Sequence, residues 1–139
     1  MDNTKYYEKF DWQSAELSKK LFDKIQKLIS VIPSDVKTIL DVGCGDGTIS
    51  TGLNEKFNVF ASDRSINALK QFNISRVCSS ADSVSIKSNT VDLVFSSEMI
   101  EHLPDEIFYN STSEFKRISK KYIFPVSYTH LTLPTKRIV

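Results

Sequence analysis

The stretch from Ile39 to Gly47 constrains the fold of this chain more than any other. Its sequence, Ile-Leu-Asp-Val-Gly-Cys-Gly-Asp-Gly, reads as a short apolar strand that ends in an acid and runs into a turn with glycine at every second position. Glycine allows positive φ and has no Cβ, so a ligand can approach the backbone N–H groups of such a turn closely. A helix that begins at Thr48 would direct its free N–H groups and its positive dipole end to the same place. The stretch therefore predicts a nucleotide-like ligand at the carboxyl end of the first strand of an open α/β sheet, with a plain tight turn as the alternative.

Length and composition are those of an ordinary globular protein with one domain. The chain has 139 residues, of which 40% are hydrophobic and 25% are charged, so it has room for a single core. The net charge of +1 gives no reason to expect nucleic acid or an anionic membrane as a partner. No apolar run approaches the roughly 20 residues of a membrane span. Residues 1–5 are polar and no apolar signal core follows them, so we expect a cytoplasmic protein.

The two cysteines predict neither a disulfide framework nor a metal site. Cys44 and Cys78 lie far apart in the sequence and form no CxxC pair. A buried filler is the expected role for Cys44, not a nucleophile.

Strand-like and helix-like patterns alternate along most of the chain. Residues 1–36 form a leading segment whose helix has apolar residues at helical spacing between Leu17 and Ile32, with lysines on the other side. Residues 37–125 form the core. Strands are expected at residues 37–42, 58–62, 75–79, 90–96 and from 122 on, with helices at 48–54, 65–72 and 105–120 between them. This alternation predicts an α/β, Rossmann-like, doubly wound parallel sheet of five strands.

The last segment, residues 126–139, belongs to none of these elements. Its sequence, VSYTHLTLPTKRIV, begins with the translation of the end of a transposase-based sequencing-library adapter, GTCTCTTATACACATCTGACGCTGCCGACG. We expect this tail to be untrimmed adapter and exclude it from the fold, with a natural C-terminal extension as the alternative. The sheet would then be incomplete, with strands one to five only, and an unpaired apolar fifth strand carries a risk of aggregation.

Acids that end successive strands, together with the glycine motif, resemble a known family. Asp63 ends the second strand, 22 residues after Asp41, and Asp82 lies in the loop after the third strand. This combination resembles the class I S-adenosylmethionine-dependent methyltransferases, in particular the broad small-molecule group often called type 11. The stretch Val-Asp-Leu-Val at residues 91–94, followed by Ser-Ser-Glu-Met-Ile-Glu-His-Leu-Pro-Asp at residues 96–105, is similar to the motif around the fourth strand of that group. The resemblance covers about residues 39–124.

The resemblance implies a site for S-adenosylmethionine at the carboxyl ends of these strands. The backbone of residues 43–47 would lie against the methionyl part and the ribose, and Asp41 would hold this loop and help to bind the ammonium group. Asp63 would accept hydrogen bonds from both ribose hydroxyls, as in dinucleotide folds, and Asp82 would accept one from the adenine amino group. Turn or helix-cap roles are the alternatives for both acids. The residues expected to bind the cofactor are Asp41, Gly43, Cys44, Gly45, Gly47, Asp63, Arg64, Ala81, Asp82, Ser83 and Ser96.

Glu98 and His102 are the candidate catalytic residues. They lie four residues apart, so on a helical turn they would share one face near the methyl acceptor. His102 could act as a general base, because the ordinary pKa of histidine is close to neutrality. The alternative is that both residues only fix the loop. Methyl transfer needs little help from a base when the acceptor is already nucleophilic, and in-line placement would then supply most of the acceleration.

The expected function is methyl transfer from S-adenosylmethionine to a small-molecule, lipid or sugar-type acceptor. An NAD(P)-dependent oxidoreductase is the alternative enzyme. Its G-x-G-x-x-G fingerprint is incomplete in this sequence. If the motif starts at Gly43, its third glycine position is occupied by Thr48, and if it starts at Gly45, that position is occupied by Ser50. A fragment that is unstable or not an enzyme is the third alternative, because the sheet would stop at its fifth strand.

Overall fold

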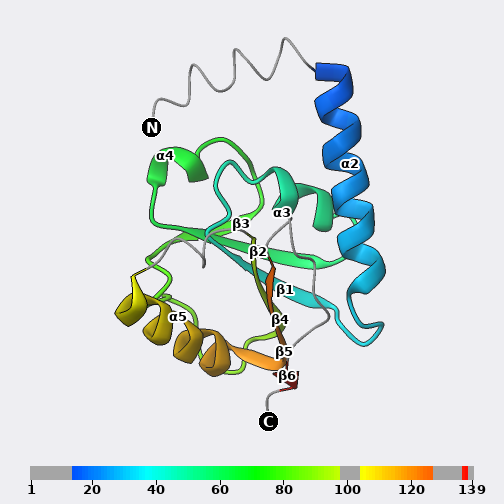
Figure 1. The fold of residues 1–139 in the computed structure, drawn as a ribbon. Coiled ribbons are helices and arrows are strands. Elements are labelled where there is room, and N and C mark those ends of the chain that lie inside the picture. The colour runs from blue at the N-terminus through cyan, green and yellow to red at the C-terminus, as the bar shows by residue number, and fades with distance from the viewer. Residues whose placement is uncertain (1–13, 98–103, 127–135, 138–139) are drawn as a thin grey trace.

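The computed structural model describes residues 14–97, 104–126 and 136–137 (Figure 1). Strands and helices alternate along this part of the chain as the sequence predicts. In chain order the elements are α2 (Ser14–Val31), β1 (Thr38–Val42), α3 (Thr48–Leu53), β2 (Asn58–Asp63), α4 (Ile66–Leu69), β3 (Ser75–Cys78), β4 (Val91–Ser97), α5 (Asp105–Ile118), β5 (Ser119–Val126) and β6 (Lys136–Arg137).

The strands form one sheet in the order β3-β2-β1-β4-β5-β6. Strands β1 to β5 are parallel, which confirms the predicted doubly wound sheet. The chain first builds outward from β1 to β2 and β3, and then returns to place β4 on the other side of β1. In open sheets of this kind, ligands bind outside the carboxyl ends of the strands at the point where the order reverses. The topology therefore places the expected site above the ends of β1 and β4.

One short strand is additional to the five that the sequence predicts. Residues 136–137 form β6, which pairs antiparallel with β5 through Tyr122 and Ile123, and Val126 still belongs to β5, opposite Ser97. An uncovered β5 would leave a row of backbone N–H and C=O groups without partners, and β6 takes up part of that row. The five predicted parallel strands are thus confirmed, and β6 is an antiparallel addition at the edge of β5. The adapter origin of residues 126–139 stays a prediction.

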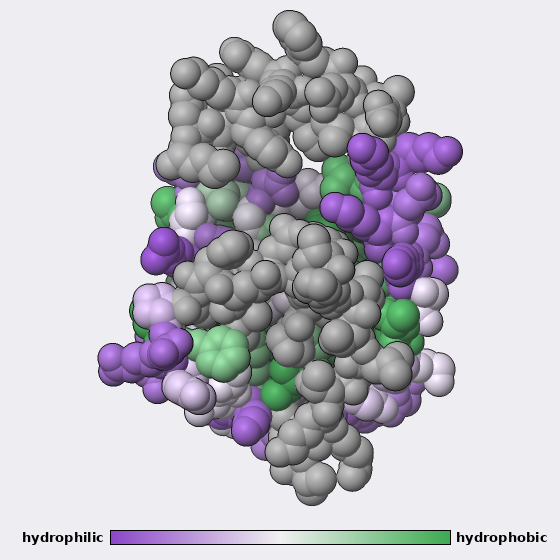
Figure 2. All heavy atoms as spheres, in the orientation of Figure 1, coloured by the Kyte–Doolittle hydropathy of each residue, from purple (hydrophilic) through white to green (hydrophobic). Residues whose placement is uncertain are grey.

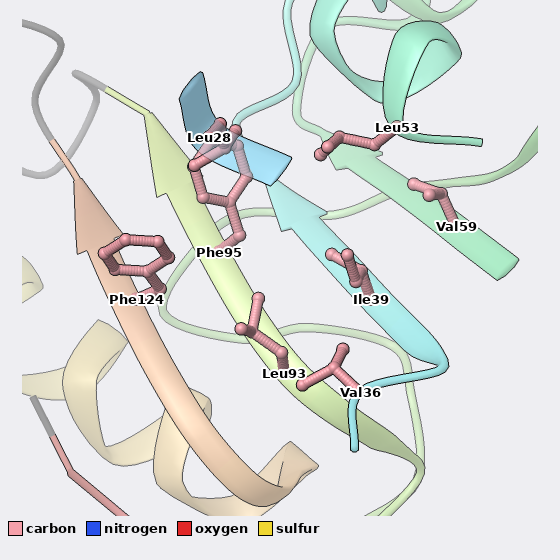
Figure 3. Close-up of a cluster of buried hydrophobic side chains, with 8 residues drawn as sticks. All are labelled: Leu28, Val36, Ile39, Leu53, Val59, Leu93, Phe95 and Phe124. Carbon is pink, nitrogen blue, oxygen red and sulfur yellow. The ribbon is translucent and has the colours of Figure 1, made fainter. Parts of the chain in front are cut away.

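Helices cover both faces of the sheet. Helices α2, α3 and α4 lie on one face and α5 lies on the other (Figure 1). On the first face, Leu28 of α2 and Leu53 of α3 pack against alternate residues of β1, β2 and β4 (Figure 3). The rings of Phe95 and Phe124 complete this cluster edge to face, with their centroids 6.5 Å apart. On the second face, Phe115 and Ile118 of α5 pack against the residues of opposite parity on β1, β4 and β5. Every central strand is therefore buried on both sides, as parallel sheets require.

Helix α2 is amphipathic, as its spacing predicts. Ile25 and Leu28 are buried, and the opposite side carries exposed lysines. Figure 2 shows hydrophilic surface over α2. Phe22 departs from the pattern, because 61% of its surface is exposed.

Helices α3, α4 and α5 are all shorter than the sequence predicts. Ser65 accepts a hydrogen bond from the N–H of Ala68 and so caps the start of α4, and the helix ends at Leu69. Helix α5 ends at Ile118, since Ser119 is extended and already pairs with Val91 in the sheet. Because Ser119 pairs with β4, α5 ends two residues before the predicted end at residue 120.

Asp92 joins the amino ends of β1 and β4. Its carboxylate accepts hydrogen bonds from the N–H groups of Lys37 and Thr38, at 2.9 and 3.2 Å, and the Thr38 hydroxyl accepts one from the N–H of Asp92. Burial raises the pKa of this carboxyl, but the two backbone bonds and nearby Lys121 outweigh it and hold the pKa below its ordinary value. The bonds fix the two strands that flank the expected site.

Candidate functional site

Residues 43–47, the glycine loop, follow β1 at its carboxyl end. Gly43, Gly45 and Gly47 all have positive φ, of 74°, 58° and 78°. The loop is tied to the next strand, because the N–H groups of Gly43 and Cys44 both donate to the carbonyl oxygen of Ser62, at 2.7 and 3.0 Å. A loop held in this way keeps its shape before any ligand arrives.

The glycines of the loop differ in what surrounds them. Among the residues that the structure describes, none has an atom within 4 Å of a Cβ placed at Gly45, whereas a Cβ at Gly47 would overlap the ring of Phe72. The open side of Gly45 can therefore receive a ligand against the backbone. The missing side chain of Gly47 instead makes room for Phe72, which sequence analysis did not single out.

The first backbone N–H group of α3 already has a hydrogen-bond partner within the chain. Asp46 accepts hydrogen bonds from the N–H and the hydroxyl of Thr48, at 3.1 and 2.8 Å. The expectation that the first N–H groups of this helix are all free is therefore wrong at Thr48. A side-chain acceptor at a helix start satisfies the donors that would otherwise face a ligand.

Asp63, at the end of β2, contacts the glycine loop directly. One of its carboxylate oxygens accepts from the N–H of Gly45 at 2.9 Å, and the other accepts from the N–H of Ser65 at 2.8 Å. The turn role, stated above as the alternative, is therefore present. Each carboxylate oxygen can accept a second hydrogen bond, so this turn role leaves room for a ligand hydroxyl.

Asp41 is fully buried beneath the glycine loop. Its Oδ2 accepts a hydrogen bond of 2.5 Å from the hydroxyl of Ser50 in α3, and its Oδ1 has no partner among the described residues. Burial raises the pKa of Asp41 to about 7; the bond from Ser50 lowers it and the charge of Asp63 raises it further. A buried acceptor without a donor is costly, and a ligand that brings a donor would relieve that cost. The signal for Ser50 in the sequence is a polar residue at a helix position that faces the sheet.

Cys44 and Arg64 complete the expected cofactor-binding set, and their role in binding stays a prediction. The Cys44 side chain is buried with Ala61 and Leu69, and burial, with the charges of Asp41 and Asp63, raises the pKa of its thiol far above the ordinary value. Such a thiol is not a nucleophile, as expected. The Arg64 side chain is exposed, and its carbonyl oxygen accepts a bond from the Cys78 thiol at 3.5 Å.

Residues 80–83 form a tight turn after β3, which we call the 80–83 turn. The N–H of Ser83 donates to the carbonyl oxygen of Ser80 at 3.2 Å, and the Ser80 hydroxyl donates to the Asp82 carboxylate at 2.7 Å. The turn starts beside the end of β2, because the N–H of Ser79 donates to the carbonyl oxygen of Asp63 at 3.0 Å. Ala81 packs against the second hydrophobic cluster. Asp63 and Asp82 therefore lie on adjoining segments.

Ser96 occupies the carboxyl end of β4, next to β1. Its side chain is fully buried, and its hydroxyl has no partner among the described residues. Glu98 and His102 follow it in the sequence but lie outside the described residues, so their proposed catalytic role stays a prediction.

Histidine, cysteine, aspartate and glutamate do not gather into any group of three that could hold a metal ion within the described part of the chain. Among the helices described, none is long and apolar enough to cross a membrane.

Comparison with known families identifies the class. Residues 39–121, more than half of the chain, match a family model described as a methyltransferase domain. The chain belongs to this family of methyltransferases, whose cofactor is S-adenosylmethionine. No curated protein matches the chain by sequence.

Solved structures show the same fold. The chain is 15% identical to DesVI from Streptomyces venezuelae, with a TM-score of 0.72, and the match covers 91% of this chain and 58% of that one. It is 14% identical to an S-adenosylmethionine-dependent methyltransferase from Thermotoga maritima, with a TM-score of 0.68 and coverage of 86% and 56%. An S-adenosylmethionine-dependent methyltransferase from Archaeoglobus fulgidus is 21% identical, with a TM-score of 0.64 and coverage of 76% and 50%. The chain spans about half the length of the structures it matches.

The site residues fit S-adenosylmethionine. The open side of Gly45 offers bare backbone to the ligand. The Oδ1 of Asp41, which no described residue contacts by a hydrogen bond, offers an acceptor for a cationic donor. Asp63 keeps acceptor capacity for a diol next to that backbone.

Proposed function

We propose that the chain supplies the cofactor-binding part of an enzyme that methylates a small-molecule, lipid or sugar-type acceptor. The observation that carries this proposal is the hydrogen bond from the Gly45 N–H to the Asp63 carboxylate, which places an acid beside the open glycine of the loop. Membership of the methyltransferase family supports it.

In this proposal each strand end holds one part of the cofactor. The Gly45 backbone lies against the ribose and the methionyl part, and Asp41 accepts from the ammonium group. Asp63 accepts from the ribose hydroxyls, and Asp82 accepts from the adenine amino group. Gly43 and Gly47 shape the loop, and Ala81, Ser83 and Ser96 line the same strand ends.

When bound, S-adenosylmethionine would supply an electrophilic methyl group. The acceptor's lone pair would form the new bond to the methyl carbon, and the electron pair of the broken carbon–sulfur bond would stay on sulfur. The chain holds the reacting groups in line and excludes water, the main source of acceleration in such a displacement. Glu98 and His102 remain our candidates for removing the acceptor's proton.

Binding measurements test the proposal without knowledge of the acceptor. We expect S-adenosylhomocysteine, the demethylated cofactor, to bind in titration calorimetry and to raise the Tm of the full chain, because a ligand that binds only the folded state stabilises it. NADH is the matched control, and we expect it to do neither. Stabilisation by NADH alone would contradict the proposal, as would the absence of binding by S-adenosylhomocysteine.

Replacing Asp63 with alanine should weaken binding of S-adenosylhomocysteine by about 10- to 100-fold, which corresponds to the loss of roughly 1.5–3 kcal/mol from charged hydrogen bonds. Asp63→Asn, which keeps one acceptor oxygen, should lose less. Asp23→Ala, which removes an exposed acid from α2, serves as the control. Titration calorimetry gives the affinities, and an unchanged affinity in Asp63→Ala would refute the role of Asp63.

A further inference from the structure

The chain between the 80–83 turn and β4 is held mainly by side chains of α5. Val84 is the first residue after the turn, and both of its backbone polar groups bond to that helix. Its N–H donates to Glu114 Oε2 at 2.9 Å, and its carbonyl oxygen accepts from Arg117 Nη2 at 3.0 Å. Its side chain is buried with Phe115 and Ile118 of the same helix. Val84 is therefore an anchor point of this loop.

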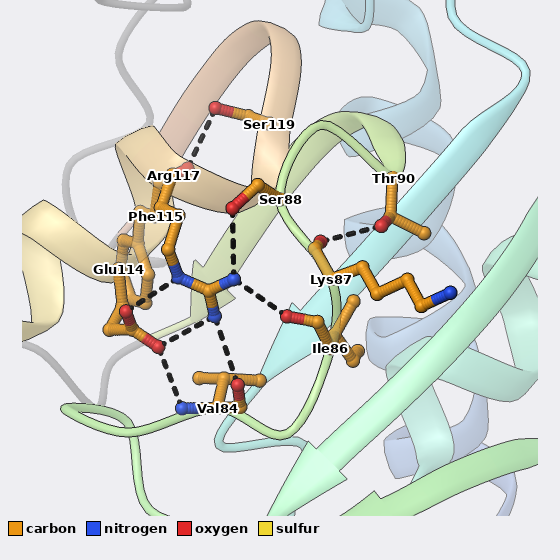
Figure 4. A network of polar contacts seen from close by, with 9 residues as sticks. All are labelled: Val84, Ile86, Lys87, Ser88, Thr90, Glu114, Phe115, Arg117 and Ser119. Carbon is orange, nitrogen blue, oxygen red and sulfur yellow. Dashed lines mark hydrogen bonds and ion pairs between the residues drawn. The ribbon is translucent and has the colours of Figure 1, made fainter.

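Glu114 and Arg117, the two residues that bond to Val84, also bond to each other (Figure 4). Two guanidinium nitrogens of Arg117 meet the two carboxylate oxygens of Glu114, at 2.7 and 2.9 Å. A further nitrogen, Nη1, reaches the carbonyl oxygen of Ile86 at 2.8 Å and the Ser88 hydroxyl at 3.3 Å. A paired, forked geometry of this kind gives both strength and orientation.

The pair is more than a surface ion pair. The side chain of Glu114 is 19% exposed and that of Arg117 is 33% exposed. The bond from Arg117 is the main cause that lowers the pKa of Glu114, so the carboxylate stays charged. Loss of Glu114 would leave the Val84 N–H without its bond, and loss of Arg117 would do the same to the Val84 carbonyl oxygen. Either loss costs more than a missing exposed pair.

The 80–83 turn is thus fastened at both ends. At one end the Ser79 N–H bonds to the carbonyl oxygen of Asp63, and at the other end Val84 bonds to Glu114 and Arg117. The Asp82 carboxylate lies between these two fastenings. Its position therefore depends on a pair of residues in a helix on the far side of the sheet from α3.

We propose that Glu114 and Arg117 are positioning residues for the adenine end of the cofactor, and that they act through Val84 on the 80–83 turn. This inference rests on the proposed function, in which Asp82 binds the adenine amino group. A hydrogen bond to a base requires its acceptor to be placed within a fraction of an ångström, and a supporting pair supplies that precision.

The test compares two ligands that differ in the adenine ring. S-adenosylhomocysteine contains the ring, whereas S-ribosylhomocysteine lacks it but keeps the ribose and the amino-acid end. In the full chain, Arg117→Gln should bind S-adenosylhomocysteine about tenfold more weakly, the loss of roughly one hydrogen bond to the base. Its affinity for S-ribosylhomocysteine should change by less than about twofold on the same argument. Lys116→Gln is the control, because it removes the same charge from an exposed position of the same helix.

Each outcome of this test decides something. Equal losses for both ligands would show a general loss of folded protein and overturn the inference, and so would an unchanged affinity for S-adenosylhomocysteine. If the parent chain bound neither ligand, the proposed function would fail, and the inference with it. Arg117→Lys keeps the positive charge but not the paired hydrogen bonds of the guanidinium group. If Arg117→Gln does not fold, this milder variant should show the same selective loss of affinity for S-adenosylhomocysteine.

Discussion

Replacing Asp41 with asparagine should stabilise the ligand-free protein at pH 8 and flatten its dependence on pH. Asp41 is fully buried, and burial raises its pKa from 3.8 to about 7. A shift of this size corresponds to about 4 kcal/mol of lost stability once the carboxyl is ionised in the folded state. Asparagine has a similar shape and cannot ionise, so most of this loss should disappear.

The sign follows from proton binding in the two states. Between about pH 4 and pH 7 the folded state retains the Asp41 proton and the unfolded state has lost it. The free energy of unfolding must therefore fall as pH rises through this range, and it levels off above the folded pKa. Asp92 and Glu114 have lowered pKa values, so the stability that they contribute is lost only in more acidic solution.

Urea unfolding of the parent and of Asp41→Asn at pH 5 and pH 8 measures the effect. We expect the variant to lose roughly 3 kcal/mol less than the parent between these two pH values. Subtracting one protein from the other removes the contribution of every group common to both. Asp23→Asn, at an exposed site, should follow the parent. An equal loss in parent and Asp41→Asn would show that the buried carboxyl is not the source.

Alanine at Gly47 and alanine at Gly45 should harm the protein in different ways. Both positions have positive φ, which costs a residue with a Cβ about 1–2 kcal/mol. At Gly47 the new Cβ also overlaps the Phe72 ring, and overpacking adds about 1–3 kcal/mol. Gly47→Ala should therefore lower the free energy of unfolding by about 2–5 kcal/mol, the sum of these two terms.

At Gly45 the Cβ meets no atom of the described residues within 4 Å, so only the backbone term should appear in the stability. The same Cβ would occupy the space that we assign to the ligand, and binding of S-adenosylhomocysteine should fall by at least about tenfold, since close backbone approach is lost. Urea unfolding and titration calorimetry separate the two effects. Phe72→Leu should restore part of the stability of Gly47→Ala and none of the binding of Gly45→Ala. The reverse pattern would show that the two glycines have the opposite roles.

Much of the fold could be predicted because its signals are local. The apolar run before Asp41, the glycines after it and the acid that ends β2 all act within a few residues of the chain. Runs of buried strand residues and amphipathic helices alternate clearly, and that alternation leaves few topologies open. For the same reason Gly43, Gly45, Asp41 and Asp63 could be assigned to one edge of the sheet before the structure was known.

Element ends and the sheet edge were less predictable. Helix α5 stops at Ile118 because Ser119 finds a partner in β4, and β6 forms because the edge of β5 has unsatisfied backbone groups. Both outcomes depend on a neighbouring strand that the local pattern does not contain.

The sequence by itself determined the order of strands and helices and where the backbone turns after β1, since these follow from side-chain period and from glycine. Only the tertiary structure decided what those residues meet. Phe72 packs on Gly47, Ser50 bonds to Asp41, and Glu114 holds Val84 across 30 positions of sequence. The physical reason is that hydrophobic period reports which face of an element is buried, whereas contacts between layers depend on how the layers stack. Tertiary packing thus distinguishes the glycine that is open to a ligand from the glycine that supports the core.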